Sequence, residues 1–171
     1  MNDNKISDID IFGKVKFEKL EILDLIGNLI STINILSFTN LKKLKKLYLN
    51  NNRITDVKAL ALSEFEELEE LNLSDNKISD IKVLENVDFP KLKILSLGNN
   101  FISDITVLEV VNFKGLEVLN LSINIISDIK ALANVDFKNL KILNLHNNNI
   151  SDIKVLKRVD FKGLKNTKFK Q

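Results

Sequence analysis

Residues 92–102 read LKILSLGNNFI, and the order of apolar residues and asparagine in this stretch decides the fold. The same frame starts again at Leu20, Leu44, Leu68, Leu116 and Leu140. Its asparagine recurs every 24 residues without insertion or deletion, at Asn4, Asn28, Asn52, Asn76, Asn100, Asn124 and Asn148. A fixed period of this length is typical of a solenoid, in which near-identical units stack on one another.

Each unit predicts one short strand followed by one short helical turn. Around Leu95 and Leu97 the apolar residues alternate with others, as in a half-buried strand. Asp104, which follows Ser103, is a helix-capping residue type. Apolar residues then follow at intervals of three, a spacing that suits a short α-helix or a 3-10 turn: Ile105, Leu108 and Val111.

Two other residues recur at equivalent positions of successive repeats, each forming a column: a phenylalanine, which we explain by core packing, and the asparagine, which we explain by the needs of the backbone. A phenylalanine closes most units and should fill the core between layers, at Phe17, Phe65, Phe89, Phe113, Phe137 and Phe161, with Leu41 as the substitution. The asparagine lies where the chain must bend after the strand. Its amide can donate and accept hydrogen bonds. We therefore expect it to satisfy the peptide groups of its own bend and of the next layer.

The pattern Leu-x-x-Leu-x-Leu-x-x-Asn-x-Ile resembles the leucine-rich repeat family, and the resemblance extends from Asn4 to Phe169. The Ser/Thr-Asp-Ile continuation is similar to internalin-type repeats and to those of a protein-phosphatase regulatory subunit, although Thr32 replaces the usual Asp. The resemblance implies an α/β solenoid, a horseshoe with a concave parallel β-sheet and short α or 3-10 turns on the convex side.

The expected organisation is a single leucine-rich repeat domain over residues 1–171. It would comprise a partial repeat (1–19), six full repeats (20–163) and a degenerate end strand (164–171). Ile11, Phe12 and Val15 are expected to cover the first layer. We expect a small complete protein, with a segment of a longer repeat protein as the alternative.

The sequence offers no catalytic, cofactor-binding or metal-binding constellation. There is no cysteine, and His146 is the only histidine, on an expected exposed strand position. The recurring Asp56, Asp80 and Asp104 are better explained by helix capping than by a metal column. The net charge of +2 and the lack of aromatic residues among the convex lysines argue against nucleic-acid binding.

The outward strand positions vary while the framework does not, so recognition is expected there. Exposed apolar residues are the informative members of such a surface. Phe101, Ile123 and Ile125 should touch across two layers. Ile94, Val118 and Ile142 should form a row. Tyr48 and Arg53 are residue types enriched at binding hot spots.

We therefore predict a non-enzymatic module that binds a protein or peptide on its concave sheet. The alternatives are a regulatory or scaffold subunit that binds through its convex face or ends, and a fragment of a secreted adhesin or effector. No apolar run is long enough for a membrane span. A cytoplasmic monomer is expected. A secreted or surface location, after removal of a signal peptide, and end-to-end association are the alternatives.

Overall fold

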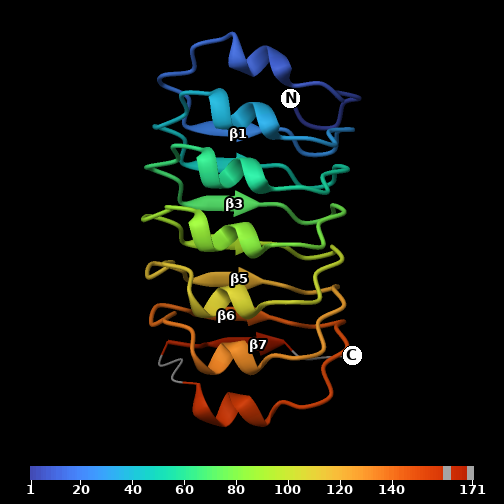
Figure 1. Cartoon of the computed structure of the whole chain (residues 1–171), viewed down its shortest axis with the longest axis vertical. Helices are drawn as coiled ribbons and strands as arrows, with labels where there is room; N and C mark the ends of the chain where they lie inside the picture. The colour runs from blue at the N-terminus through green and yellow to red at the C-terminus, as the bar shows by residue number, and fades with distance from the viewer. Residues whose placement is uncertain (160–162, 169–171) are drawn as a thin grey trace.

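The computed structural model describes residues 1–159 and 163–168, which form a stack of similar layers (Figure 1). The layers follow one another in chain order, with the two termini toward opposite ends of the stack. The described strands are β1 Ile22–Asp24, β2 Lys46–Tyr48, β3 Glu70–Asn72, β4 Ile94–Ser96, β5 Val118–Asn120, β6 Ile142–Asn144 and β7 Asn166–Lys168. The described 3-10 helices are η1 Asp10–Gly13, η2 Asn34–Phe38, η3 Lys58–Leu62, η4 Lys82–Asn86, η5 Thr106–Glu109, η6 Lys130–Ala133 and η7 Lys154–Arg158.

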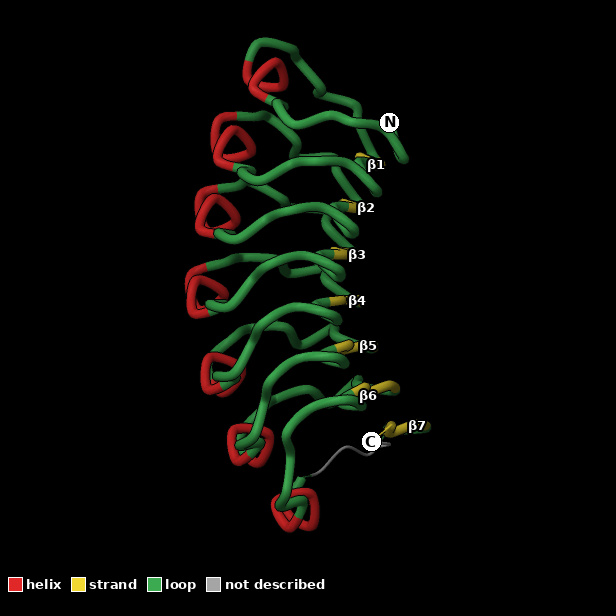
Figure 2. Tube along the Cα trace, turned by 90° about the vertical axis from the view of Figure 1, so that its right-hand side faces the viewer, coloured by secondary structure: helices red, strands yellow, loops and turns green. Residues whose placement is uncertain are grey.

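The strands form one parallel sheet in the order β1-β2-β3-β4-β5-β6-β7. Because the repeat length is constant, the register joins equivalent residues: Leu95 of β4 pairs with Leu71 of β3 and Leu119 of β5. Figure 2 shows the strands along the inner side of an arc and the helices along its outer side. The expected horseshoe with a concave sheet is confirmed.

The core is a continuous column of apolar layers between the sheet and the helices. All the inward positions expected for the fourth full layer are buried: Leu95, Leu97, Ile102, Ile105, Leu108, Val111 and Phe113. The phenylalanine column is likewise buried at Phe65, Phe89, Phe113 and Phe137, while Phe17 is half-buried. Phe161 and Phe169 lie outside the described residues.

The helical turns are 3-10 helices of four or five residues, short pieces as is usual for this tighter helix. The capping aspartate acts just before each helix rather than at the cap residue itself, which is Ile105 in η5. The Oδ1 atom of Asp104 accepts a hydrogen bond from the Thr106 N–H at 2.8 Å, forming an Asx turn that starts the helix. Thr32 does the same more weakly, accepting from the Asn34 N–H at 3.3 Å.

The two end layers are covered unequally. At the N-terminal end Ile9 and Phe12 are buried, and the rings of Phe12 and Phe17 meet edge-to-face with centroids 5.4 Å apart. The expectation was wrong for Ile11 and Val15, which are exposed. Toward the C-terminal end, η7 has no buried residue.

Candidate binding surface

The asparagine column fixes the bend that follows each strand. Asn100 donates from Nδ2 to Leu97 O in its own layer and to Leu73 O in the preceding layer, at 3.1 and 3.0 Å. Its Oδ1 accepts from the Ile78 N–H at 3.0 Å. Each buried asparagine therefore ties two layers together, as the sequence predicted, and holds the outward residues around it in a fixed position.

The residue before each of these asparagines adopts a left-handed backbone. Its φ is positive at Gly27, Asn51, Asp75, Asn99, Ile123 and Asn147. Glycine, asparagine and aspartate tolerate this conformation, whereas a β-branched residue does so only with strain. Ile123, with φ 53°, is thus strained and also partly exposed. The sequence signal was present, since isoleucine stands in a column otherwise filled by Asn, Asp and Gly.

Ile123 is one of three exposed apolar residues that follow adjacent strands, which together we call the exit-edge patch: Phe101, Ile123 and Ile125. Their exposed fractions are 55%, 43% and 48%. Phe101 and Ile125 occupy equivalent positions in adjacent layers, and Ile123 lies two residues before Ile125. The predicted exposure is confirmed, while contact between the three side chains and a partner-binding role remain predictions.

The patch continues into a line of equivalent residues from five successive layers, which we call the exit row: Arg53, Lys77, Phe101, Ile125 and Asn149. Leu29, which is half-buried, holds the equivalent position in the layer before Arg53. Backbone hydrogen bonds join its members to the preceding layer, from Lys77 N–H to Ile54 O at 2.8 Å and from Phe101 N–H to Ile78 O at 2.8 Å. These bonds keep the layers at strand-like spacing, about 4.8 Å, through the turn. Arg53 and Lys77 are exposed at one end of the row.

A second apolar row crosses the sheet itself. Ile94, Val118 and Ile142 are paired in register on adjacent strands. Ile94 and Val118 are half-buried, and Ile142 is exposed. Two further outward positions lie between this row and the exit-edge patch, and their residues separate the two apolar surfaces. Those residues are small or polar in the layers concerned: Ser96, Gly98, Asn120 and Ser122.

Tyr48 is held in place by the sheet. Its hydroxyl donates to Glu70 Oε2 at 2.9 Å, and the same oxygen lies 3.5 Å from Lys46 Nζ. Partial burial and the neighbouring Glu70 raise the pKa of Tyr48. The side chain is half-buried and fixed in position. It lies in the same layer as Arg53 and two layers away from Phe101, so the structure does not bring it into the exit-edge patch.

His146 follows β6 and is half-buried, rather than exposed within a strand as expected. The Nδ1 atom of its ring lies 2.7 Å from Asn144 Oδ1. Among the described residues there is no group of three or more acidic, histidine or cysteine side chains arranged to hold a metal ion. No helix in the described part of the chain has the length and apolar character to cross a membrane.

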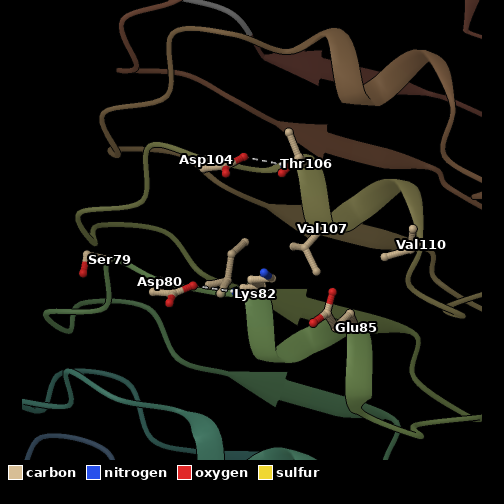
Figure 3. A pocket seen from close by; sticks show the side chains of 9 residues that line it. Ser79, Asp80, Lys82, Glu85, Asp104, Thr106, Val107 and Val110 are labelled. Atoms are coloured by element: carbon tan, nitrogen blue, oxygen red, sulfur yellow. Dashed lines mark hydrogen bonds between the residues drawn. The ribbon is translucent and has the colours of Figure 1, made fainter.

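The convex side carries shallow hollows between successive helices. Figure 3 shows the one between η4 and η5, lined by Asp80, Lys82, Glu85, Asp104 and Val107 among others. Its aspartates are engaged by the backbone, and hydrogen bonding to Thr106 lowers the pKa of Asp104. Similar hollows lie between η3 and η4 and between η6 and η7. We attribute them to helix packing rather than to a specific ligand.

Sequence reasoning missed a second exposed apolar pair, on the outer side. Phe38 and Leu62 end η2 and η3, occupy equivalent positions in adjacent layers, and are 78% and 71% exposed. Phe38 stands outside the phenylalanine column that fills the core. Aligning the repeats at this position would have revealed it, because the column holds polar residues at Asn86 and Asn134 and a further exposed apolar residue at Val110.

Ion pairs between layers were also missed. Glutamate and lysine alternate at the position before the strand, and three pairs form there: Glu21–Lys45 at 3.0 Å, Glu69–Lys93 at 2.8 Å and Glu117–Lys141 at 2.6 Å. Lys91 and Glu67 pair similarly at 2.6 Å. The acidic run that begins at Glu64 is therefore a set of interlayer partners for lysines.

Comparison with known proteins agrees with this architecture. The family description "Leucine rich repeat" matches residues 1–54 and 18–78, and "Leucine Rich repeats (2 copies)" matches residues 66–110 and 114–158. The sequence matches none of the curated proteins with which it was compared. Leucine-rich repeat domains are generally protein-binding modules.

Three solved structures illustrate the similarity. Internalin C2 from Listeria monocytogenes is 32% identical, with a TM-score of 0.82, and the match covers 99% of this chain and 69% of that one. An internalin, InlF, from the same organism is 30% identical with a TM-score of 0.81, covering 99% and 47%. The ectodomain of the Arabidopsis thaliana receptor kinase GASSHO1/SCHENGEN3, solved with Casparian strip integrity factor 2, is 22% identical with a TM-score of 0.65, covering 83% and 17%. From the repeat geometry and these matches together, the chain belongs to the leucine-rich repeat family.

Proposed function

We propose that this chain is a non-enzymatic binding module that holds a protein or peptide partner on the concave side of its sheet, centred on the exit-edge patch. The observation that carries the proposal is that Phe101, Ile123 and Ile125, which follow adjacent strands, are all exposed. Large apolar side chains gathered on a surface favour burial by a partner. Arg53 and Lys77 on one side and Asn149 on the other would form a polar rim, the usual surrounding of an interface centre.

Ile94, Val118 and Ile142 would extend the contact across the sheet, and Tyr48 and Arg53 would contribute at its N-terminal end. Tyr48 is suited to this because its hydrogen bond to Glu70 leaves little side-chain freedom to lose on binding. A monomer in the cytoplasm belongs to the proposal, with end-to-end association and a secreted or surface location as alternatives.

The test is a double substitution in the patch. Phe101→Ala with Ile125→Ser should weaken binding by at least about 2 kcal/mol, the scale of interface hot spots. Its free energy of unfolding should change by well under that amount, because both side chains are half exposed. Partners captured by cross-linking in cells that produce the protein would be purified and their affinity for both forms measured by calorimetry.

The convex face provides the matched control and the second candidate. Phe38→Ala with Leu62→Ser removes a similar apolar pair from the opposite side. Retained affinity in this variant, together with loss in the exit-edge variant, supports the proposal. The reverse result would reject it in favour of a scaffold subunit that binds through its convex face, a candidate that rests on the exposure of Phe38 and Leu62.

A further inference from the structure

The charged half of the exit row indicates the chemistry of the partner. Arg53 and Lys77 precede Phe101 and Ile125 in the row, one residue from each layer. Both cations are exposed, and within the described part of the chain neither forms an ion pair with a carboxylate. Most lysines on the strand-entry side, by contrast, have a glutamate partner in a neighbouring layer.

Two carboxylates in the layer of Lys77 have other partners. Asp75, two residues before Lys77, accepts a hydrogen bond from Asn99 Nδ2 at 2.6 Å. Glu70 accepts from Tyr48 and faces Lys46. Arg53 and Lys77 therefore keep their positive charge available to a ligand, and lie directly beside an apolar surface.

The spacing of the row suits a helical segment. Steps of about 4.8 Å between layers lie close to the rise of about 5.4 Å per turn of an α-helix. A helix lying along the row would present one side chain per turn to each layer. An extended chain fits less well, since its same-face side chains repeat at about 6.6 Å.

Resting on the proposed function, we propose that the exit row binds an amphipathic helical segment of a partner protein, whose docking face is acidic at one end and apolar at the other. The acidic side chains pair with Arg53 and Lys77, and the apolar side chains cover Phe101, Ile123 and Ile125. Two unpaired cations beside an apolar surface are electrostatically complementary to carboxylates that lie beside an apolar surface of the partner. The strained backbone of Ile123 is an independent sign of a functional surface.

The experiment is selection from a random peptide library displayed on phage, with the whole chain as target. The wild type should enrich peptides that carry acidic residues next to an apolar helical face.

Three variants are compared with the wild type in the same selection. Arg53→Glu with Lys77→Glu reverses the charge. Phe101→Ala with Ile125→Ser removes the apolar surface. Lys58→Glu with Lys82→Glu is the matched control, because it makes the same charge change in the same layers at the starts of η3 and η4. Circular dichroism verifies folding of each.

An enriched peptide is then synthesised, and its affinity for each form is measured by fluorescence anisotropy. Charge reversal in the exit row should weaken binding by at least about tenfold, more at low than at high salt. The charge-reversed peptide should bind the reversed variant instead, and the Lys58/Lys82 control should bind as the wild type does.

The outcomes separate this inference from the proposed function. Peptides that depend on Phe101 and Ile125 but not on Arg53 and Lys77 overturn the acidic partner and leave the concave binding site standing. If the wild type enriches nothing beyond what the Phe101/Ile125 variant enriches, both are overturned. Peptides lost only in the Lys58/Lys82 control overturn both as well and point to the convex face.

Discussion

At residue 123 the demands of the backbone and of the surface conflict. The turn requires a left-handed conformation there, which asparagine, aspartate or glycine supplies in the other described turns. Isoleucine in that conformation brings its branched Cβ close to the backbone. Its side chain recovers this cost only in part by packing, since it is 43% exposed. The residue therefore has a net cost to stability in the free protein, as expected where a surface serves binding.

Replacing this residue separates the two demands. Ile123→Asn should raise the free energy of unfolding by about 1 kcal/mol, because asparagine relieves the strain. Urea denaturation should show the higher midpoint with an unchanged slope. The reciprocal change, Asn147→Ile, places isoleucine in the equivalent turn and should lower the stability by a similar amount. If neither variant shifts the midpoint, the strain is absent and the binding proposal loses this support.

At the scale of the strand, the helix and the columns they build, the sequence predicts what a single repeat needs. Alternation at Leu95 and Leu97 predicts the strand, and the need of the bend for hydrogen bonds predicts the role of Asn100. The spacing of Ile105 and Leu108 fits both an α-helix and a 3-10 helix, so the helix type required the structure. Contacts between layers were missed because they depend on aligning charges one period apart, as at Glu69 and Lys93.

The candidate site was predictable to a different extent. The variation of Phe101 and Ile125 against a constant framework was enough to predict that they are exposed. Their separation from Ile94 and Val118 depends on which outward positions lie between them. The exposure of Phe38 was missed because that column was not aligned across the repeats, where it falls outside the phenylalanine column of the core.

The ion pairs between layers should make stability sensitive to acid. Hydrogen bonds from Lys91 and Lys93 lower the pKa values of Glu67 and Glu69 in the folded protein. A carboxyl group with a lowered folded pKa stabilises the fold above its unfolded pKa, about 4.3. That contribution is lost as the pH falls through the lowered values. Stability should therefore be insensitive to these groups from about pH 6 to 8 and should decline below about pH 4.

Denaturation midpoints measured against pH would test this. The variant Glu67→Gln with Glu69→Gln should lose less stability on acidification than the wild type. Salt at molar concentration should reduce the difference in acid sensitivity between the wild type and this variant, because it screens exposed ion pairs. The control is Glu18→Gln with Glu109→Gln, two exposed carboxylates outside the ion pairs of the described residues, which should follow the wild type. Parallel curves for wild type and the Glu67/Glu69 variant would contradict the role of these pairs.

At the scale of the whole molecule, stability should vary along the stack. Each inner layer has an apolar neighbour on both sides, whereas the end layers have one. The N-terminal layer is protected by buried Ile9 and Phe12. The last described helix is not, and Ile153 before it is 54% exposed although the equivalent Ile129 is 1% exposed. The C-terminal layer should therefore open first.

Amide hydrogen exchange can measure this with equivalent hydrogen bonds. Leu156 N–H donates to Ile153 O at 3.1 Å, and Leu108 N–H donates to Ile105 O at 3.0 Å, so the two amides differ mainly in the burial of their layers. Leu108 should be protected by nearly the global free energy of unfolding, and Leu156 by clearly less. Protection should be highest from about Leu68 to Leu121, and lower before Leu20 and after Leu164. Within the lower set, residues before Leu20 should exchange more slowly than those after Leu164. Equal protection at Leu156 and Leu108 would instead mean that the stack unfolds as one cooperative unit, because the less buried layer would then open only when the whole core does.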